Sequence, residues 1–137
     1  MPTLTLTLDH KAHPQGSKNA YIHRHTGRIV QVESVKGLKT ARQTLSAILS
    51  YEATRHGWQK PSKDVPVFIE MVFYYERGKT VTRQHHTVKP DGDKLQRYLW
   101  DAVTQAFNIW ADDSQVTEWH GAKRYGPTNQ IEITISY

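Results

Sequence analysis

The sequence predicts an α+β fold, a single domain over residues 1–137 with a mixed β-sheet and two helices packed on it. Its 137 residues match the length of one domain. Segments with an apolar residue at every second position alternate with segments in which apolar residues recur every three or four positions. The resulting order of strands, helix, strand, helix and two strands is typical of helices covering one sheet.

Three strands are expected in the N-terminal part of the chain. Thr and Leu alternate strictly over residues 3–8, which predicts a strand with its leucines facing the core. Residues 10–19 include proline and glycine and are expected to form a loop. The segments 20–25 and 28–33 flank Thr26-Gly27, which predicts a short hairpin.

A helix and the strongest strand are expected next. Ser34 could cap the helix and Gly57 could end it. The apolar positions that share one face of this helix are Leu38, Ala41, Leu45, Ile48 and Leu49. Residues 65–76 alternate so that one face of the strand is nearly all apolar, while Glu70 interrupts the other face.

The C-terminal half is expected to hold the second helix and two more strands. Residues 77–90 show no periodicity and predict an exposed loop. Residues 91–107 predict a helix, and its inward side chains are Leu95, Leu99, Ala102 and Ala106. Residues 116–125 and 130–137 are expected to close the sheet as an antiparallel pair, with a turn near residues 127–129.

Composition excludes several classes of protein. The absence of cysteine excludes disulfides, thiolate zinc sites and a cysteine nucleophile. No run approaches the roughly 20 apolar residues of a membrane helix. The N-terminus has no basic segment followed by an apolar one, so a signal peptide is not expected. These features predict a soluble intracellular protein without a membrane partner.

Positive charge is concentrated in two parts of the chain. The net charge is +5, and residues 10–60 carry nine Lys or Arg against Glu33 and Glu52. Residues 77–90 carry four Lys or Arg, His85 and His86, and no acid. A basic surface attracts polyanions, so the distribution favours nucleic-acid binding, although a merely soluble basic protein is the alternative.

Two pairs of carboxylates flank the second predicted helix. Asp91 and Asp93 stand at its start with Gly92 between them, and a helix cap would explain one of the two. Asp112 and Asp113 follow the helix, where a turn or cap is the alternative. If the next strand runs beside the helix start, Asp113 joins Asp91 and Asp93. Three such carboxylates need a cation, and their hard oxygen ligands suit Mg²⁺ or Mn²⁺.

Arg97 lies four residues after Asp93 on the same helical face. It can pair with Asp93 or Asp101, or it can contact a scissile phosphate. A catalytic role for it would be charge stabilisation, because arginine does not donate a proton at working pH. His85-His86 is expected to contact phosphate or solvent rather than a metal, and Trp100 is expected to pack in the core.

Three ordered motifs resemble those of the RusA family of Holliday-junction resolvases. They are Asp91-Gly92-Asp93-Lys94-Leu95, Asp101-Ala102-Val103 and Asp112-Asp113-Ser114-Gln115-Val116, and Lys123-Arg124-Tyr125 follows them. The segment Pro14-Gln15-Gly16-Ser17-Lys18 is similar to a loop of phage and actinobacterial members.

The resemblance implies a RusA-like fold and a homodimeric, Mg²⁺-dependent endonuclease that resolves four-way DNA junctions by paired symmetric nicks in recombination and repair. It implies a bacterial cytoplasm, with a bacterial, phage or prophage gene. The family's metal-binding aspartates match Asp91, Asp93 and Asp113, which leaves Asp112 and Asp101 to support the site. The family's essential lysine falls at Arg97, a change that keeps the charge but loses proton donation.

Phosphate contacts are expected from basic residues in and around the loops. These are Lys18, Arg24, Arg28, Lys79, Arg83, Lys89, Lys94, Lys123 and Arg124. Three alternatives stay open: a metal nuclease acting on flaps or RNA without junction preference, a non-catalytic module that binds branched DNA, and a small basic structural protein.

Overall fold

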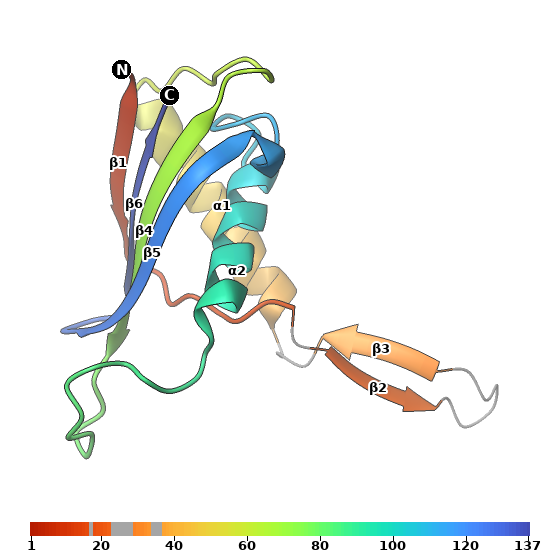
Figure 1. Ribbon diagram of the computed structural model, residues 1–137, viewed down its shortest axis with the longest axis vertical. Coiled ribbons are helices and arrows are strands. Elements are labelled where there is room, and N and C mark those ends of the chain that lie inside the picture. Colours follow the sequence, from red (N-terminus) through yellow and green to blue (C-terminus); the bar gives the residue numbers. More distant parts are fainter. Residues whose placement is uncertain (17, 23–28, 34–36) are drawn as a thin grey trace.

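The computed structural model describes residues 1–16, 18–22, 29–33 and 37–137. The fold has a four-stranded sheet and two α-helices, and the helices lie on one face of the sheet (Figure 1). The order across the sheet is β1 (Thr3–Leu8), β6 (Gln130–Ser136), β4 (Val67–Glu76) and β5 (Val116–Gly126). The β1–β6 and β6–β4 pairs are antiparallel and the β4–β5 pair is parallel, so the sheet is mixed and the predicted α+β class is confirmed.

The predicted hairpin forms a sheet of its own. β2 (Lys18–Ile22) pairs antiparallel with β3 (Ile29–Glu33) and joins no strand of the four-stranded sheet. Figure 1 shows it projecting from the side of the molecule that carries the helices. The expected turn at Thr26-Gly27 and the expected helix cap Ser34 lie outside the described residues.

The core lies between the sheet and the helices α1 (Leu38–Arg55) and α2 (Gly92–Gln105). The four side chains that were predicted to face inward from the second helix are all buried, namely Leu95, Leu99, Ala102 and Ala106, the last of which directly follows α2. The three leucines of β1 and the three isoleucines of β6 are buried opposite them. Trp110 is fully buried, and its Nε1–H donates to Thr104 Oγ1 at 2.8 Å. The period-two and period-3.6 patterns therefore identified the faces that meet in the core.

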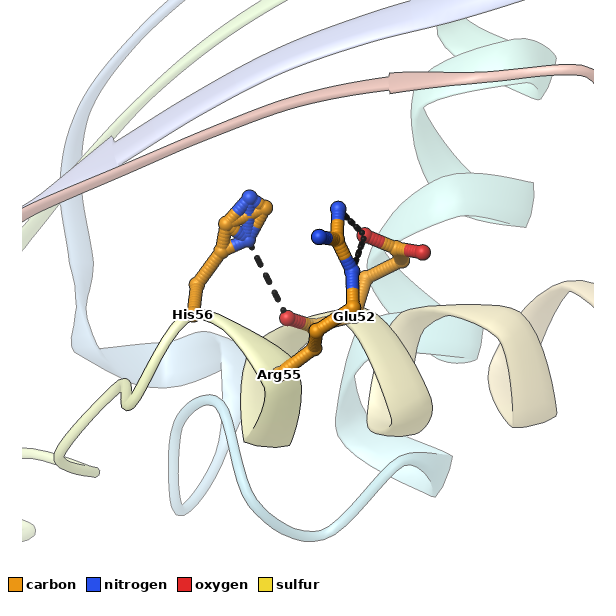
Figure 2. A network of polar contacts seen from close by, with 3 residues as sticks. All are labelled: Glu52, Arg55 and His56. Carbon is orange, nitrogen blue, oxygen red and sulfur yellow. Dashed lines mark hydrogen bonds and ion pairs between the residues drawn. The ribbon is translucent and has the colours of Figure 1, made fainter.

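Helix α1 ends close to the predicted residue. Its last residue is Arg55, and Gly57 has a φ of +68°, a left-handed conformation that glycine adopts without strain. Figure 2 shows the last turn, where Arg55 Nε and Nη2 donate to Glu52 Oε2 at 3.2 and 2.9 Å. His56 Nδ1 lies 3.3 Å from the carbonyl oxygen of Glu52. This exposed ion pair adds little stability.

The prediction that β5 and β6 pair with each other is wrong. β4 lies between them and is hydrogen-bonded to both. The backbone N–H of Glu76, at the end of β4, donates to Asn129 Oδ1 at 2.9 Å, so β4 reaches the turn that joins β5 to β6. Parallel strands need a crossover of a dozen or more residues, and α2 provides it between β4 and β5. Turn residues between β5 and β6 therefore connect strands that are not neighbours.

Candidate active site

Asp91 and Asp93 stand exposed at the start of α2. Asp91 occupies the N-cap position, but its side chain makes no capping hydrogen bond. Lys94 Nζ lies 3.7 Å from Asp91 Oδ2 in an exposed ion pair. A Cβ on Gly92 would meet no atom within 4 Å, so the residue between the two aspartates adds no crowding there. Capping therefore does not account for this pair, and both carboxylates can reach an external cation.

Asp113 lies at the other end of α2 from this pair. Strand β5 runs beside α2, as it must if Asp113 is to approach Asp91 and Asp93. However, the residue of β5 that reaches the start of α2 is Lys123, which lies far along the strand from Asp113. Asp113 begins the short helix η1 (Asp113–Gln115) and lies near Asp101, whose carboxylate acts on its pKa. Asp101 is eight residues beyond Asp93, or about 12 Å along a helix axis. Within the described part of the chain no three His, Asp or Glu side chains are grouped to hold a metal ion.

Asp112 and Asp113 differ in their surroundings. Asp112 caps η1, because its Oδ2 accepts from the backbone N–H of Ser114 at 3.1 Å, and hydrogen bonds from Ser114 lower the pKa of Asp112. Burial raises the pKa of Asp113, and the carboxylates of Asp112 and Asp101 raise it further. A nearby cation would relieve this repulsion. Asp112 thus stabilises the local fold, whereas Asp113 has a carboxylate that a cation would stabilise.

Gln115, a motif residue for which the sequence predicts no role, is 5% exposed and hydrogen-bonded through both polar atoms of its side chain. Its Oε1 accepts from the backbone N–H groups of Ala111 and Asp112 at 2.7 and 3.1 Å. Its Nε2 donates to the carbonyl oxygens of Ser62 and Val65 at 2.9 and 3.1 Å. The glutamine of the Asp-Asp-x-Gln motif therefore ties the segment carrying Asp113 to the chain that enters β4.

Replacing Gln115 with Ala is expected to lower the free energy of unfolding by about 2–3 kcal/mol, because it leaves several part-buried backbone groups without partners. Urea denaturation of the purified variant would measure the change. Gln105→Ala, an exposed position on α2, is the matched control and should change stability by less than about 0.5 kcal/mol. Equal losses in the two variants would mean that the Gln115 hydrogen bonds do not stabilise the fold.

Gln15 holds the loop after β1 against both helices. Its backbone N–H donates to the carbonyl oxygen of Lys94 at 3.1 Å, and its Nε2 donates to Asp101 Oδ2. Arg42 Nη1, from α1, donates to Gln15 Oε1 at 2.7 Å. The Asp101 carboxylate thereby accepts a hydrogen bond from Gln15 and helps to hold this loop against α2. The signal for Gln15 was the Pro14-Gln15-Gly16 motif, whose contacts could not be inferred from the sequence.

Arg97 is exposed and passes close to Gly16. A Cβ on Gly16 would lie 3.0 Å from Arg97 Nη1, and Gly16 has a φ of +103°, so both space and backbone conformation favour glycine there. Among the described residues no carboxylate lies within ion-pair distance of Arg97; the ion pairs found are Arg55–Glu52 and Lys94–Asp91. The expected alternatives of pairing with Asp93 or Asp101 are not realised, and the guanidinium is left to an external anion.

The basic loop of residues 77–90 is anchored by His86. Its ring stacks on Tyr75 with centroids 4.8 Å apart and contacts Tyr125 at 4.9 Å. The guanidinium groups of Arg77 and Arg83 lie 5.1 and 5.8 Å from the Tyr125 ring. His86 is therefore buried in an aromatic stack and does not have the contact with phosphate or solvent that was expected of it. His85 is exposed.

The structure places the predicted phosphate-binding residues in different settings. Four are exposed on or near the basic loop and β5, namely Lys79, Arg83, Lys89 and Arg124. Lys123 Nζ instead donates to the carbonyl oxygens of Val88 and Pro90 at 2.6 and 2.9 Å, so it holds the loop at the start of α2. Lys18 begins β2, and Arg24 and Arg28 lie outside the described residues. Trp100 packs edge-on against Trp110 and Trp119, as predicted.

Three histidines should make folding stability depend on pH. Burial lowers the pKa of His86, and Lys123 adds to this effect. Burial also lowers the pKa of His10 and of His13. Below the ordinary value of about 6.5 the unfolded chain takes up protons that the folded chain does not, so stability falls as the pH falls.

We therefore expect the free energy of unfolding to be lower at about pH 5.5 than at about pH 7.5. Chemical denaturation at the two values would measure this. His86→Phe keeps an aromatic ring between the two tyrosines without a titrating group, so its stability should change less between the two pH values. A wild-type protein that is equally stable at both would contradict the prediction.

Exposed carboxylates and an unpaired arginine on α2, next to a basic loop, are suited to an enzyme that acts on phosphodiesters. The sequence matches the family model described as endodeoxyribonuclease RusA over residues 11–136, nearly its whole length. The chain therefore belongs to the RusA family of endodeoxyribonucleases, as its motifs indicated. A search of curated proteins found no match. In the described part of the chain, neither helix has the length and apolar character needed to cross a membrane.

Proposed function

We propose that the protein is a Mg²⁺-dependent nuclease that resolves four-way DNA junctions by paired symmetric cuts, in DNA recombination and repair. The observation that carries the proposal is the exposed pair Asp91 and Asp93, with Arg97 one turn further along α2, in a member of this family. Mg²⁺ is usually held by one or two carboxylates together with water and substrate phosphate, so this pair fits the ion, and Mn²⁺ is the alternative.

Each group of residues has a distinct part in the proposed reaction. Asp91 and Asp93 hold the ion, which when bound supplies charge stabilisation at the phosphate and acidifies water. Arg97 stabilises the additional negative charge that develops on the phosphate oxygens. The exposed cations Lys79, Arg83, Lys89 and Arg124, together with Lys94, position the flanking phosphates and make binding salt-dependent.

In the homodimer expected from the resemblance, Asp113 of one copy can join the Asp91 and Asp93 pair of the other. A four-way junction has two-fold symmetry, and a C₂ dimer offers it two equivalent sites. Because α2 separates Asp113 from Asp91 and Asp93 within one copy, Asp113 joins the pair only if it comes from the second copy. We therefore propose two composite sites per dimer, each with Asp91 and Asp93 from one copy and Asp113 from the other.

The test is cleavage of a labelled synthetic four-way junction, with and without Mg²⁺, beside a linear duplex of the same sequence. Metal-dependent, paired, symmetric nicks in the junction alone support the proposal. Equal cleavage of flaps, RNA or linear duplex would favour a nuclease without junction preference. Tight junction binding without a cut at any Mg²⁺ or Mn²⁺ concentration would favour a non-catalytic module.

A further inference from the structure

A cavity of about 370 Å³ is lined in part by Asp91, and the proposed function assigns no bound group to it. One wall is the loop that follows β1, with Lys11 and His13. The end of the basic loop, with Lys89, and the start of α2, with Lys94, also line the cavity. Its size is in the range of small-ligand sites, which measure about 300–1,000 Å³.

The charge lining the cavity is suited to an anion. Lys11, Lys89, Lys94 and His13 face one acid, Asp91, whose carboxylate lies 3.7 Å from Lys94 Nζ. Lys11 and Lys89 are exposed, so their ammonium groups can turn towards a bound group. A phosphate is the anion that a protein acting on DNA meets, and several lysines converging on one cavity favour it over a neutral ligand.

The rest of the lining is apolar. Ala12 and Tyr75 are 4% and 6% exposed, and the Tyr75 hydroxyl donates to the carbonyl oxygen of Ala12 at 2.7 Å. That hydroxyl is therefore already used, and the tyrosine offers the cavity mainly carbon surface. Pro14 and Pro90 add further apolar lining. A free inorganic phosphate would leave this surface unused, whereas a nucleotide has a sugar and a base to cover it.

We propose that this cavity binds a single unstacked nucleotide of a DNA strand, with its phosphate on Lys11, Lys89 and Lys94 and its sugar or base against Pro14 and Pro90. A base within a duplex cannot enter such a cavity without leaving the stack. The crossover of a four-way junction, where stacking is interrupted, provides such a nucleotide. The inference rests on the proposed function, and it places the bound nucleotide next to Asp91 and so next to the bond to be cut.

The first experiment tests the ligand chemistry without cleavage. The full-length protein, free of divalent metal, is titrated with thymidine 5′-monophosphate and separately with thymidine, and the His13 ring signals are followed by NMR. The monophosphate should bind saturably and raise the pKa of His13, and thymidine should bind at least about tenfold more weakly, because charge-assisted contacts to phosphate supply much of the affinity.

Two variants locate the binding. Lys11→Ala/Lys89→Ala should weaken monophosphate binding by about tenfold or more, since each lysine contributes a charge-assisted contact. Lys60→Ala, an exposed lysine in the segment between α1 and β4 that does not line the cavity, is the matched control and should bind as the wild type does. Equal weakening in both variants, or no effect on His13, would overturn the cavity as the binding site.

The second experiment asks whether DNA supplies the nucleotide. 2-Aminopurine is placed in turn at the positions around the crossover of a junction, because its fluorescence rises when it leaves the stack. Wild-type protein without metal should raise the signal several-fold at one position, and Lys11→Ala/Lys89→Ala should abolish the rise. Monophosphate binding with no fluorescence change at any position would mean that the cavity binds free nucleotides and not DNA, which contradicts the proposal.

The outcomes separate this inference from the proposed function. If Asp93→Asn abolishes junction cleavage but Lys11→Ala/Lys89→Ala cleaves and binds junctions like the wild type, the cavity proposal and the phosphate contact of Lys89 fail, and metal-dependent cleavage of junctions stands. If the fluorescence rises as expected but no junction is cut at any metal concentration, nucleotide capture is supported and the nuclease proposal fails.

Discussion

Replacing Asp93 with Asn is expected to reduce the rate of junction cleavage by about a thousandfold, because a metal ion contributes several kcal/mol of charge stabilisation and Asn is a weaker ligand. The side chain is exposed, so folding should be unaffected. Single-turnover cleavage of a labelled junction at saturating protein measures the rate. Asp64→Asn, an exposed aspartate in the segment before β4, removes the same charge elsewhere and should cleave at the wild-type rate.

Mixing two inactive variants extends this prediction to the dimer. Consider a mixed dimer in which one copy carries Asp93→Asn and the other carries Asp113→Asn. If the sites are composite, one site contains both substituted residues and the other contains neither. The mixture should therefore nick one strand of the junction, although each variant alone does not. Sites formed within one copy would each carry one substitution, so a mixture that stays inactive would contradict the composite arrangement.

A cleaving monomer would contradict the dimer itself. Sedimentation of the protein at the concentrations used for cleavage distinguishes the two cases. The loss of cleavage in Asp93→Asn would stand in either case, because it depends on the exposed carboxylate pair of α2 and not on the origin of Asp113.

The faces of the elements could be predicted because they follow from local periodicity. The alternation of Leu4, Leu6 and Leu8, and of the isoleucines in β6, needs only the geometry of a strand with one buried face. The inward face of α2 follows in the same way from a period of 3.6. Strand partners are not local information: the turn at residues 127–129 predicted a β5–β6 pair, whereas β4 lies between these strands.

The same limit applies to the candidate site. Asp91 and Asp93 could be identified because two residues of one helix start must lie close together. The position of Asp113 depends on the direction of β5 relative to α2, which the sequence does not specify. The structural roles of Gln15, His86 and Lys123 depend on contacts between segments far apart in the chain. Sequence reasoning could list these three residues as motif members or charges, but it could not separate binding from structural roles.

Arg97→Ala is expected to lower the maximal cleavage rate by about a hundredfold to a thousandfold with a much smaller change in junction affinity, as observed when one charge-stabilising donor is removed from an active site. The reason is the unpaired state of Arg97: no carboxylate of the described residues lies within ion-pair distance, so its charge is available to the phosphate. Lys39→Ala, an exposed cation on α1, is the matched control and should leave the rate unchanged.

Arg97→Lys separates the two roles that this position can have. A lysine keeps the positive charge but loses the planar guanidinium that can contact two phosphate oxygens at once. If charge stabilisation is the function, Arg97→Lys retains cleavage within about tenfold of the wild type at neutral pH, where the lysine stays protonated. If Arg97 only positions DNA, Arg97→Ala weakens binding, reduces its salt dependence by about one phosphate contact and leaves the maximal rate unchanged, whereas Arg97→Lys keeps the charge and so keeps the salt dependence. A loss of maximal rate in Arg97→Ala that Arg97→Lys does not share would therefore assign Arg97 to charge stabilisation in the transition state and not to DNA positioning.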